Sequence, residues 1–162
     1  MTKPAPATSP ALCLMTRNGA SRDVYSERFI LTGEGDEARD AQERLLEAVE
    51  ERQYDASSRF AIRLALEEAL SNAFKHGNQN LPGKRVTVDC TVDGESVVID
   101  IADEGEGFDP QAVPDPAEDE NLEIPSGRGI VLMRSFMTDV TFHPPGNRVR
   151  MTYVKGGSGA GE

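Results

Sequence analysis

The segment from residue 56 to residue 77, ASSRFAIRLALEEALSNAFKHG, constrains the fold most, because it combines a helical core pattern with a polar pair that such a core does not need. With about 100° of rotation per residue, one face of the segment collects its apolar side chains: Ile62, Leu66, Ala69, Leu70 and Ala73. This stripe predicts an α-helix packed against the rest of the protein. Asp55 can cap its N-terminus, and Gly77 followed by Asn78 suits its C-terminal end.

The polar pair is Glu68 and Asn72, which lie beside the stripe. They are one turn apart and about 40° apart around the helix axis, so both side chains can reach the same small object. Ala61 and Ala65 share this flank, where small side chains would let a ligand approach the helix closely. A solvated polar face is the simpler interpretation of the pair, and the other motifs of the chain decide between the two.

The length of 162 residues suits one domain, which can bury about two-thirds of its unfolded surface. Cys13 and Cys90 have no metal-type spacing, so neither a disulfide framework nor a zinc site is predicted, and a reducing compartment fits. No apolar run approaches the roughly 18 residues of a membrane span, and the N-terminus lacks the apolar stretch of a signal peptide. We therefore expect a soluble, cytoplasmic protein that does not cross a membrane.

The net charge of −11 comes from one segment. Residues 103–123 contain nine acids and no base, and the remainder of the chain has 19 acids against 17 bases. This near-balance leaves no basic stripe of the kind that nucleic-acid binding requires. Direct binding of nucleic acid is therefore not expected.

Three parts are predicted along the chain. Residues 1–20, rich in Pro, Ala, Ser and Thr, predict a flexible arm, residues 21–155 form the domain, and residues 156–162 are a disordered tail. Within the domain, YSERFILT predicts a strand from Tyr25, and Asp36 is the expected N-cap of the following helix. That helix has one apolar stripe on a charged cylinder: Ala38, Ala41, Leu45, Ala48 and Val49.

Two hairpins complete the predicted sheet. RVTVDCTVDGESVVIDIAD contains two runs rich in Val, Ile and Thr around a turn at residues 93–96, and TDVTFH and RVRMTYV flank Pro-Pro-Gly-Asn. Before the second hairpin, GIVLMRSFM predicts a third helix. The fold class is therefore α+β, a two-layer sandwich of one mixed, mostly antiparallel five-stranded sheet with three helices on one face.

Two glycine motifs flank a long irregular segment. DEGEG at residues 103–107 follows the first hairpin, and SGRG at residues 126–129 opens the third helix. Each motif alone is more typical of an ordinary turn, although glycines at a helix N-terminus also let backbone N–H groups approach a phosphate. The connection between them is far longer than usual, and connections of that length are usually functional or disordered.

In combination, E-x-x-x-N on a helix, D-x-G-x-G after a strand and G-x-G before a helix resemble the ATP-binding fold shared by gyrase, heat-shock chaperone, histidine-kinase and mismatch-repair ATPases. The resemblance covers about residues 25–155. It implies ATP and Mg²⁺ as ligands, with Asn72 binding the metal, Asp103 accepting a hydrogen bond from the adenine amino group, and four glycines shaping the pocket and its lid: Gly105, Gly107, Gly127 and Gly129. The chemistry agrees, because a carboxamide oxygen suits Mg²⁺ and guanine has a carbonyl where adenine has its amino group.

Within that superfamily, EEALSNAFKHG and SGRGIVLMRSFMTDV look most like the bacterial anti-sigma factor serine kinases. The resemblance implies that Glu68 is the general base for a serine hydroxyl in phosphoryl transfer. Lys75 and Arg128 are weaker candidates for phosphate contact, since each is more simply a solvent-facing charge. The implied partners are a sigma factor, a small anti-sigma-antagonist protein that is phosphorylated on serine, and a second copy of the chain in a homodimer.

Two alternatives stay open from the sequence. The same ATP pocket could serve a non-catalytic, nucleotide-dependent switch that controls a protein interface. The chain could also be a stand-alone histidine-kinase-like ATPase component, although Glu68 stands where histidine kinases usually have asparagine. The acidic loop has no base before Arg128, so we expect its acids to face a basic partner surface. His76 and His143 have no partner cluster, and neither is expected to bind a metal.

Overall fold

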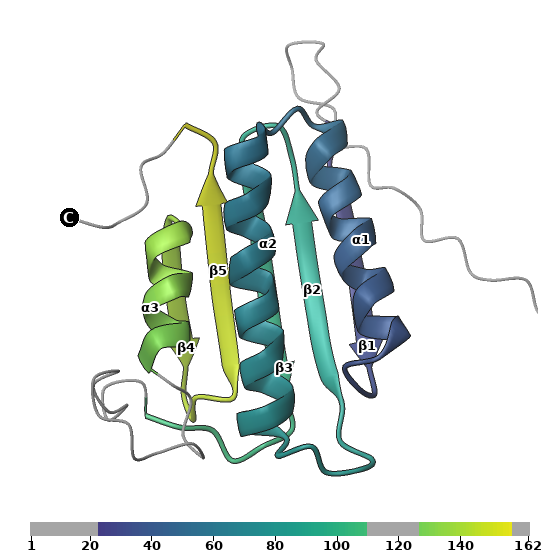
Figure 1. The fold of residues 1–162 in the computed structure, drawn as a ribbon, viewed down its shortest axis with the longest axis vertical. Helices are drawn as coiled ribbons and strands as arrows, with labels where there is room; N and C mark the ends of the chain where they lie inside the picture. Colours follow the sequence, from purple (N-terminus) through teal and green to yellow (C-terminus); the bar gives the residue numbers. More distant parts are fainter. Residues whose placement is uncertain (1–22, 110–126, 157–162) are drawn as a thin grey trace, which may run out of the picture.

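Five strands form one sheet that carries the helices on one face (Figure 1). The computed structural model describes residues 23–109 and 127–156. The strands are β1 (Tyr25–Leu31), β2 (Val86–Val92), β3 (Ser96–Asp103), β4 (Asp139–His143) and β5 (Arg148–Val154), in the spatial order β1-β2-β3-β5-β4. The helices are α1 (Asp36–Glu51), α2 (Ala56–Ser71) with its π-helical continuation η1 (Asn72–Gly77), and α3 (Gly127–Phe136). The predicted arm and tail lie outside the described residues, apart from Gly156.

The predicted α+β sandwich is confirmed, and all four strand pairings are antiparallel. β2 with β3 and β4 with β5 are the two predicted hairpins. In the first, the Asp93 Oδ1 atom accepts hydrogen bonds from the N–H groups of Glu95 and Ser96 at 2.7 and 2.8 Å, which closes the turn. Because β3 also pairs with β5, the two hairpins join side by side, and the end of β3 lies next to the start of β5.

Of the two helix starts whose N-cap residue the structure describes, those of α1 and α2, one follows the local capping rules. Asp55 caps α2 as predicted, and its Oδ1 atom accepts a 2.7 Å hydrogen bond from the Ser58 N–H. The prediction for Asp36 is wrong, because Gly35 is the N-cap of α1 and makes no side-chain cap. Asp36 instead lies within the first turn, where its negative charge favours the positive end of the helix dipole. None of the helices in the described ranges is long and apolar enough to cross a lipid bilayer.

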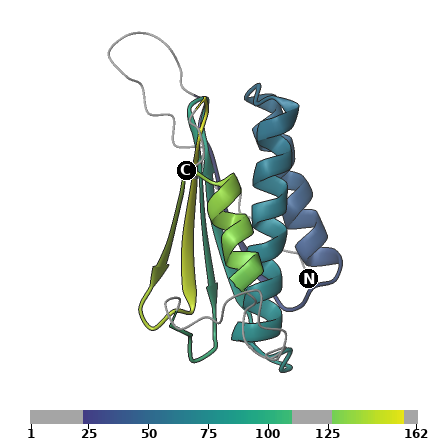
Figure 2. The ribbon, with the colours of Figure 1, turned by 60° about the vertical axis from the view of Figure 1, so that its left-hand side comes forward.

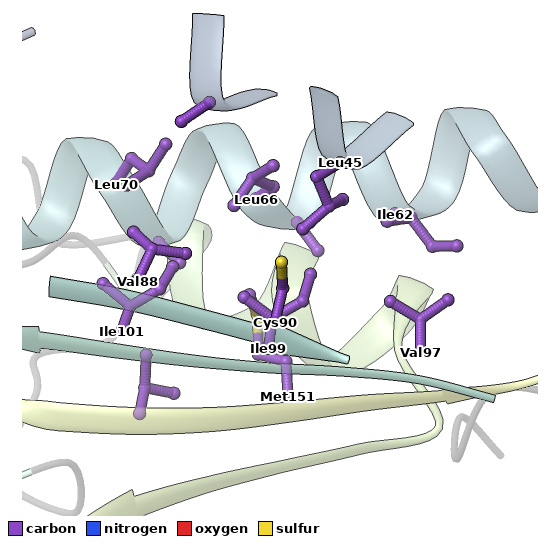
Figure 3. Packing of buried hydrophobic residues seen from close by; sticks show 14 of the residues in the cluster. Leu45, Ile62, Leu66, Leu70, Val88, Cys90, Val97, Ile99, Ile101 and Met151 are labelled. Carbon is purple, nitrogen blue, oxygen red and sulfur yellow. The ribbon is translucent and has the colours of Figure 1, made fainter. Parts of the chain in front are cut away.

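The core lies between the helices and the sheet (Figure 3). Leu45 from α1 and Ile62 and Leu66 from α2 point towards the central strands, and each is at most 2% exposed. Burial of one such side chain contributes about 1.5–3 kcal/mol. Cys90 of β2 joins this core as a free thiol, and burial raises its pKa to about 12, so it behaves as an apolar residue.

Both predicted helical stripes are buried as expected, but α2 buries more than its stripe. Ala61 and Ala65 were expected to leave room for a ligand, and they are instead 7% and 0% exposed. Helix α2 packs against both α1 and α3, so its small side chains are covered by protein. The room for a ligand must therefore lie nearer the C-terminal end of α2.

The opposite face of the sheet has no helix on it among the described elements (Figure 2). Charged side chains of β1, β2, β3 and β5 form ion pairs on this face. Asp89 of β2 and Asp100 of β3 are directly opposite in the register, so two like charges are neighbours. Asp89 pairs with Arg28 at 2.6 Å in an exposed position. Asp100 is only 7% exposed and pairs with Arg148 and Arg150 at 3.1 and 2.9 Å. Its buried charge therefore depends on these two partners.

We expect Asp100→Asn to lower the Tm by several degrees, because it removes the counter-charge that two neighbouring arginines share at a buried position. The matched control is Asp89→Asn, which removes an exposed pair screened by water and salt and should change the Tm little. Thermal denaturation of both variants measures this. Equal losses of stability in the two variants would contradict the conclusion that the buried Asp100 pairs stabilise the fold more than the exposed Asp89 pair does.

Candidate functional site

A cavity of about 430 Å³ lies at the end of the sheet where β3 ends and β5 begins, beside η1. In Figure 1 this is the lower end, where α2 also finishes and α3 starts. The cavity has the size of a small-molecule site. Its lining comes from both layers and includes polar and apolar side chains: Asn72, His76, Lys84, Asp103, Phe108, Met133 and Phe142. Segments that are far apart in the sequence therefore meet at one hollow.

Asp103 is held in the cavity wall by backbone contacts. Its N–H donates to the Asn147 carbonyl at 2.9 Å, and its Oδ1 atom accepts a 2.8 Å hydrogen bond from the Gly105 N–H. A β-carbon at Gly77 would overlap the Asp103 carboxylate, and a β-carbon at Gly105 would overlap the Gly77 carbonyl. Only glycine at both positions lets the end of η1 meet the end of β3 this closely.

Burial raises the pKa of the Asp103 carboxyl, while the Gly105 N–H and the nearby Lys84 ammonium oppose that shift. Folding therefore places a carboxylate where ionisation is disfavoured. A half-buried carboxylate next to apolar side chains can accept hydrogen bonds from a ligand with little competition from water. Asp103 thus has the properties of a recognition group as well as those of a turn residue.

The prediction of an α-helix through Gly77 is only partly right, because the helix widens into a π-helix from Asn72 onwards. The Asn78 N–H donates to the Ala73 carbonyl at 2.8 Å, which spans one residue more than an α-helical bond. Such π turns occur frequently at functional sites. Asn72 lines the cavity from this turn, and its Nδ2 atom is buried with no hydrogen-bond partner in the described part of the chain.

Glu68 lies one turn from Asn72 and faces the start of α3. A β-carbon at Gly129 would be 2.9 Å from the Glu68 Oε2 atom and 3.6 Å from the Asn72 Nδ2 atom. Glu68 is half-buried and does not itself line the cavity, whereas Asn72 does. The structure therefore brings Gly129 to the predicted polar pair, and Asn72 connects that pair to the cavity at Asp103.

The other predicted residues differ in how close they come to the cavity. Gly107 lines the cavity. Gly105 does not line it, and it acts on the cavity only by donating its N–H to the Asp103 Oδ1 atom. Lys75 and Arg128 are exposed, and neither lines the cavity. Gly127 is the first residue of α3. The acidic loop between these elements falls largely at residues 110–126, outside the described residues.

Sequence reasoning missed the wall that the turn between β4 and β5 provides. Gly107 has a φ of +84°, and a β-carbon there would overlap the Pro145 carbonyl, so the segment after β3 lies directly on this turn. Asn147 strengthens the contact by donating from its Nδ2 atom to the Gly105 carbonyl at 3.3 Å. Phe108 and Phe142 pack edge to face, with ring centroids 5.2 Å apart. Their local sequence carries no signal for this contact, which depends on the pairing of β3 with β5.

Carboxylates and imidazoles alone do not form a metal site in the described part of the chain. No group of three or more His, Cys, Asp or Glu side chains suited to a metal occurs among residues 23–109 and 127–156. Asn72 fits Mg²⁺ as a single neutral ligand, since the amide can present its oxygen by turning over and Mg²⁺ takes its remaining ligands from water and phosphate oxygens. The buried, unpartnered Nδ2 atom marks this amide as available for a ligand.

Two comparisons with known proteins agree with this geometry. The sequence model of the histidine kinase-like ATPase domain matches residues 32–153. An anti-sigma F factor from Oceanobacillus iheyensis is 31% identical over 81 residues, which cover 49% of this chain and 56% of that protein. The aligned part therefore spans little more than half the length of this relative.

We expect Asp103→Asn to raise the Tm of the ligand-free protein at neutral pH. The raised pKa means that the folded state holds the Asp103 proton more tightly than the unfolded state, so the contribution of Asp103 to stability falls as pH rises towards that pKa. Asparagine keeps an oxygen for the Gly105 N–H but has no charge to bury. Its advantage should therefore shrink as the pH is lowered through the raised pKa.

Thermal denaturation over a pH series measures this difference, with Glu106→Gln as the matched control. Glu106 is an exposed acid that lines the same cavity, so its replacement removes the same charge without removing a buried carboxylate. If both variants raised the Tm equally, the effect would come from the net charge and not from burial.

Proposed function

The chain belongs to the histidine kinase-like ATPase domain family, and on that premise we propose that it binds Mg-ATP and acts as a protein-serine kinase that regulates a sigma factor. The observation that carries the proposal is the single cavity lined by both Asn72 and Asp103. In the family resemblance these two residues serve opposite ends of the nucleotide. Binding of a whole ATP molecule requires that Asn72 and Asp103 line the same cavity.

Asp103 is the proposed reader of adenine. Its carboxylate is fixed by the Gly105 N–H, and the absence of side chains at Gly77 and Gly105 lets the end of η1 pack directly against it. Phe108 and Met133 provide apolar surface on the same cavity, which suits the faces of a purine ring. A carboxylate accepts from the adenine amino group, whereas guanine would present a carbonyl oxygen to it.

Asn72 and Glu68 are the proposed residues for phosphoryl transfer. Bound Mg-ATP would supply the transferable phosphoryl group and offset its negative charge. Asn72 would contribute its carboxamide oxygen to the metal, and Glu68 would accept the proton of the acceptor serine hydroxyl. Gly127 and Gly129 carry no side chain that would keep a phosphate from approaching the backbone at the start of α3. Lys75 and Arg128 remain weaker candidates, in keeping with their exposed positions outside the cavity lining.

The proposed sigma-factor partner rests on the relative, which is itself named an anti-sigma F factor, and the antagonist protein rests on the family resemblance of the sequence motifs. We assign to this chain a sigma factor that it sequesters, and a small anti-sigma-antagonist protein that it phosphorylates on serine. The proposal includes a cytoplasmic location and a homodimer. The nine acids of residues 103–123 suit a basic partner surface.

One observation favours a second candidate, a nucleotide-dependent switch without phosphoryl transfer. Glu68 does not line the cavity, and its Oε2 atom lies against Gly129 at the start of α3. A general base needs hydrogen-bond access to the hydroxyl from which it takes a proton. With α3 in this position Glu68 would be a structural neighbour of the pocket, and the nucleotide would change only the protein-binding surface.

We expect the protein to bind Mg-ATP in preference to Mg-GTP, and Asp103→Asn to weaken ATP binding by about tenfold or more, because a charge-assisted hydrogen bond is lost. Isothermal titration calorimetry with both nucleotides measures this. Glu106→Gln again serves as the control, since it removes an acid of the same cavity and should leave the preference in place. Equal affinities of the wild type for ATP and GTP would remove adenine recognition from the proposal.

The kinase and switch candidates predict different effects for Asn72→Ala and Glu68→Gln. Asn72→Ala should impair Mg²⁺-dependent nucleotide binding. Glu68→Gln keeps the size of the side chain and should leave binding nearly intact, while it slows serine phosphorylation about 10²–10⁴-fold. The assay uses the small antagonist protein that co-purifies from the native cell, with phosphoserine read by mass spectrometry. If the wild type bound ATP and this partner but never phosphorylated it, the switch would be the correct function.

A further inference from the structure

Asn78, the residue after η1, is one of the few buried polar side chains of the described fold, and it is 2% exposed. Its side chain connects two other segments. The Nδ2 atom donates to the Arg85 carbonyl at 3.0 Å, and the Oδ1 atom accepts from the Glu104 N–H at 2.8 Å. Its backbone N–H donates a 2.8 Å hydrogen bond to the Ala73 carbonyl. Asn78 therefore ties the end of η1 to the chain just before β2 and just after β3.

These bonds lie next to a close contact in the cavity wall. Gly77 directly precedes Asn78, Asp103 directly precedes Glu104, and Gly77 and Asp103 are so close that a β-carbon at Gly77 would overlap the carboxylate. The hydrogen bond between Asn78 and Glu104 therefore lies one residue along the chain from the contact between Gly77 and Asp103. It therefore ties the backbone next to Asp103 to the residue that follows η1.

We propose that Asn78 is a positioning residue for base recognition, which holds Asp103 at the distance from Gly77 at which its carboxylate can read a purine amino group. The inference rests on the proposed function, since it assumes that Asp103 reads the base. Asn78 itself does not line the cavity and acts only through Asp103. Nothing in the ATP-binding motifs of the sequence assigns it a role.

A purely structural role for Asn78 would predict different effects of substitution from a positioning role. The two side-chain hydrogen bonds of Asn78 allow these two roles to be distinguished. Asn78→Ala removes both bonds. Asn78→Asp keeps an oxygen for the Glu104 N–H but loses the donor to Arg85 and places a carboxylate against that carbonyl, which costs stability. If Asn78 only stabilises the fold, selectivity should follow the Tm of each variant. If it positions Asp103, selectivity should follow the bond to Glu104.

The experiment has one readout without nucleotide and one with it. The first is hydrogen exchange of the Gly105 amide, measured by NMR, because that amide bonds to the Asp103 Oδ1 atom. The second is the ratio of Mg-ATP to Mg-GTP affinity. Ser58→Ala is the control, since Ser58 is another buried polar residue, whose hydroxyl bonds to Tyr153 at the far end of α2.

We expect Asn78→Ala to speed exchange at Gly105 and to reduce the affinity ratio, each by about tenfold. Asn78→Asp should retain both despite a lower Tm, and Ser58→Ala should lower the Tm without changing either. Exchange and selectivity that follow the Tm across all three variants would overturn the inference. If Asn78→Ala does not fold, Asn78→Asp decides: retained protection of Gly105 supports the role, and lost protection overturns it.

Failure of the inference and failure of the proposed function give different results. If Asp103→Asn abolishes the preference for ATP but Asn78→Ala leaves it and the Gly105 exchange unchanged, the function stands and the role of Asn78 is wrong. If the wild type shows no preference for ATP, adenine recognition by Asp103 is wrong, and the role of Asn78 in base recognition falls with it. The Gly105 exchange would then still report whether Asn78 holds the Asp103 carboxylate in place.

Discussion

The candidate site depends on one close contact, between the backbone of Gly77 and the carboxylate of Asp103. A side chain at Gly77 would displace that carboxylate, and a side chain at Gly105 would displace Gly77 in turn. The contact joins the end of the most buried helix to the end of β3, the middle strand of the sheet. The site is therefore anchored on two elements that the core already holds in place, and a ligand meets groups that need little reorganisation.

The same region departs from locally favourable structure in three ways. The helix adopts π geometry from Asn72, the Asn72 Nδ2 atom has no partner among the described residues, and the Asp103 carboxyl is buried enough to raise its pKa. None of these helps folding, and each leaves a group ready for a ligand. Proteins that break local rules at one place usually do so where they function. The apolar core between helices and sheet offsets the cost.

Much of the fold could be predicted from the sequence, because periodicity and turn residues are local signals. The stripes of α1 and α2, the cap at Asp55 and both hairpins were found in this way. The failures come from contacts between segments. Ala61 and Ala65 are covered by protein, the π turn at Asn72 has no sequence signature, and the wall formed by Phe108 and Phe142 depends on β3 pairing with β5. The prediction of Asp36 as the N-cap of α1 was wrong by one residue, because Gly35 is the N-cap.

The two ends of the site differ in how they are held. Asp103 is fixed by hydrogen bonds from or to Gly105, Asn147 and the neighbouring strand, so its position follows from the sheet itself. Glu68 is bounded instead by the first turn of α3, where a β-carbon at Gly129 would be 2.9 Å from its Oε2 atom. A change in the position of α3 would alter the surroundings of Glu68 and leave those of Asp103 intact. The proposed base recognition would thus depend on the sheet and its hydrogen bonds, whereas the proposed chemistry at Glu68 would depend on the placement of one short helix.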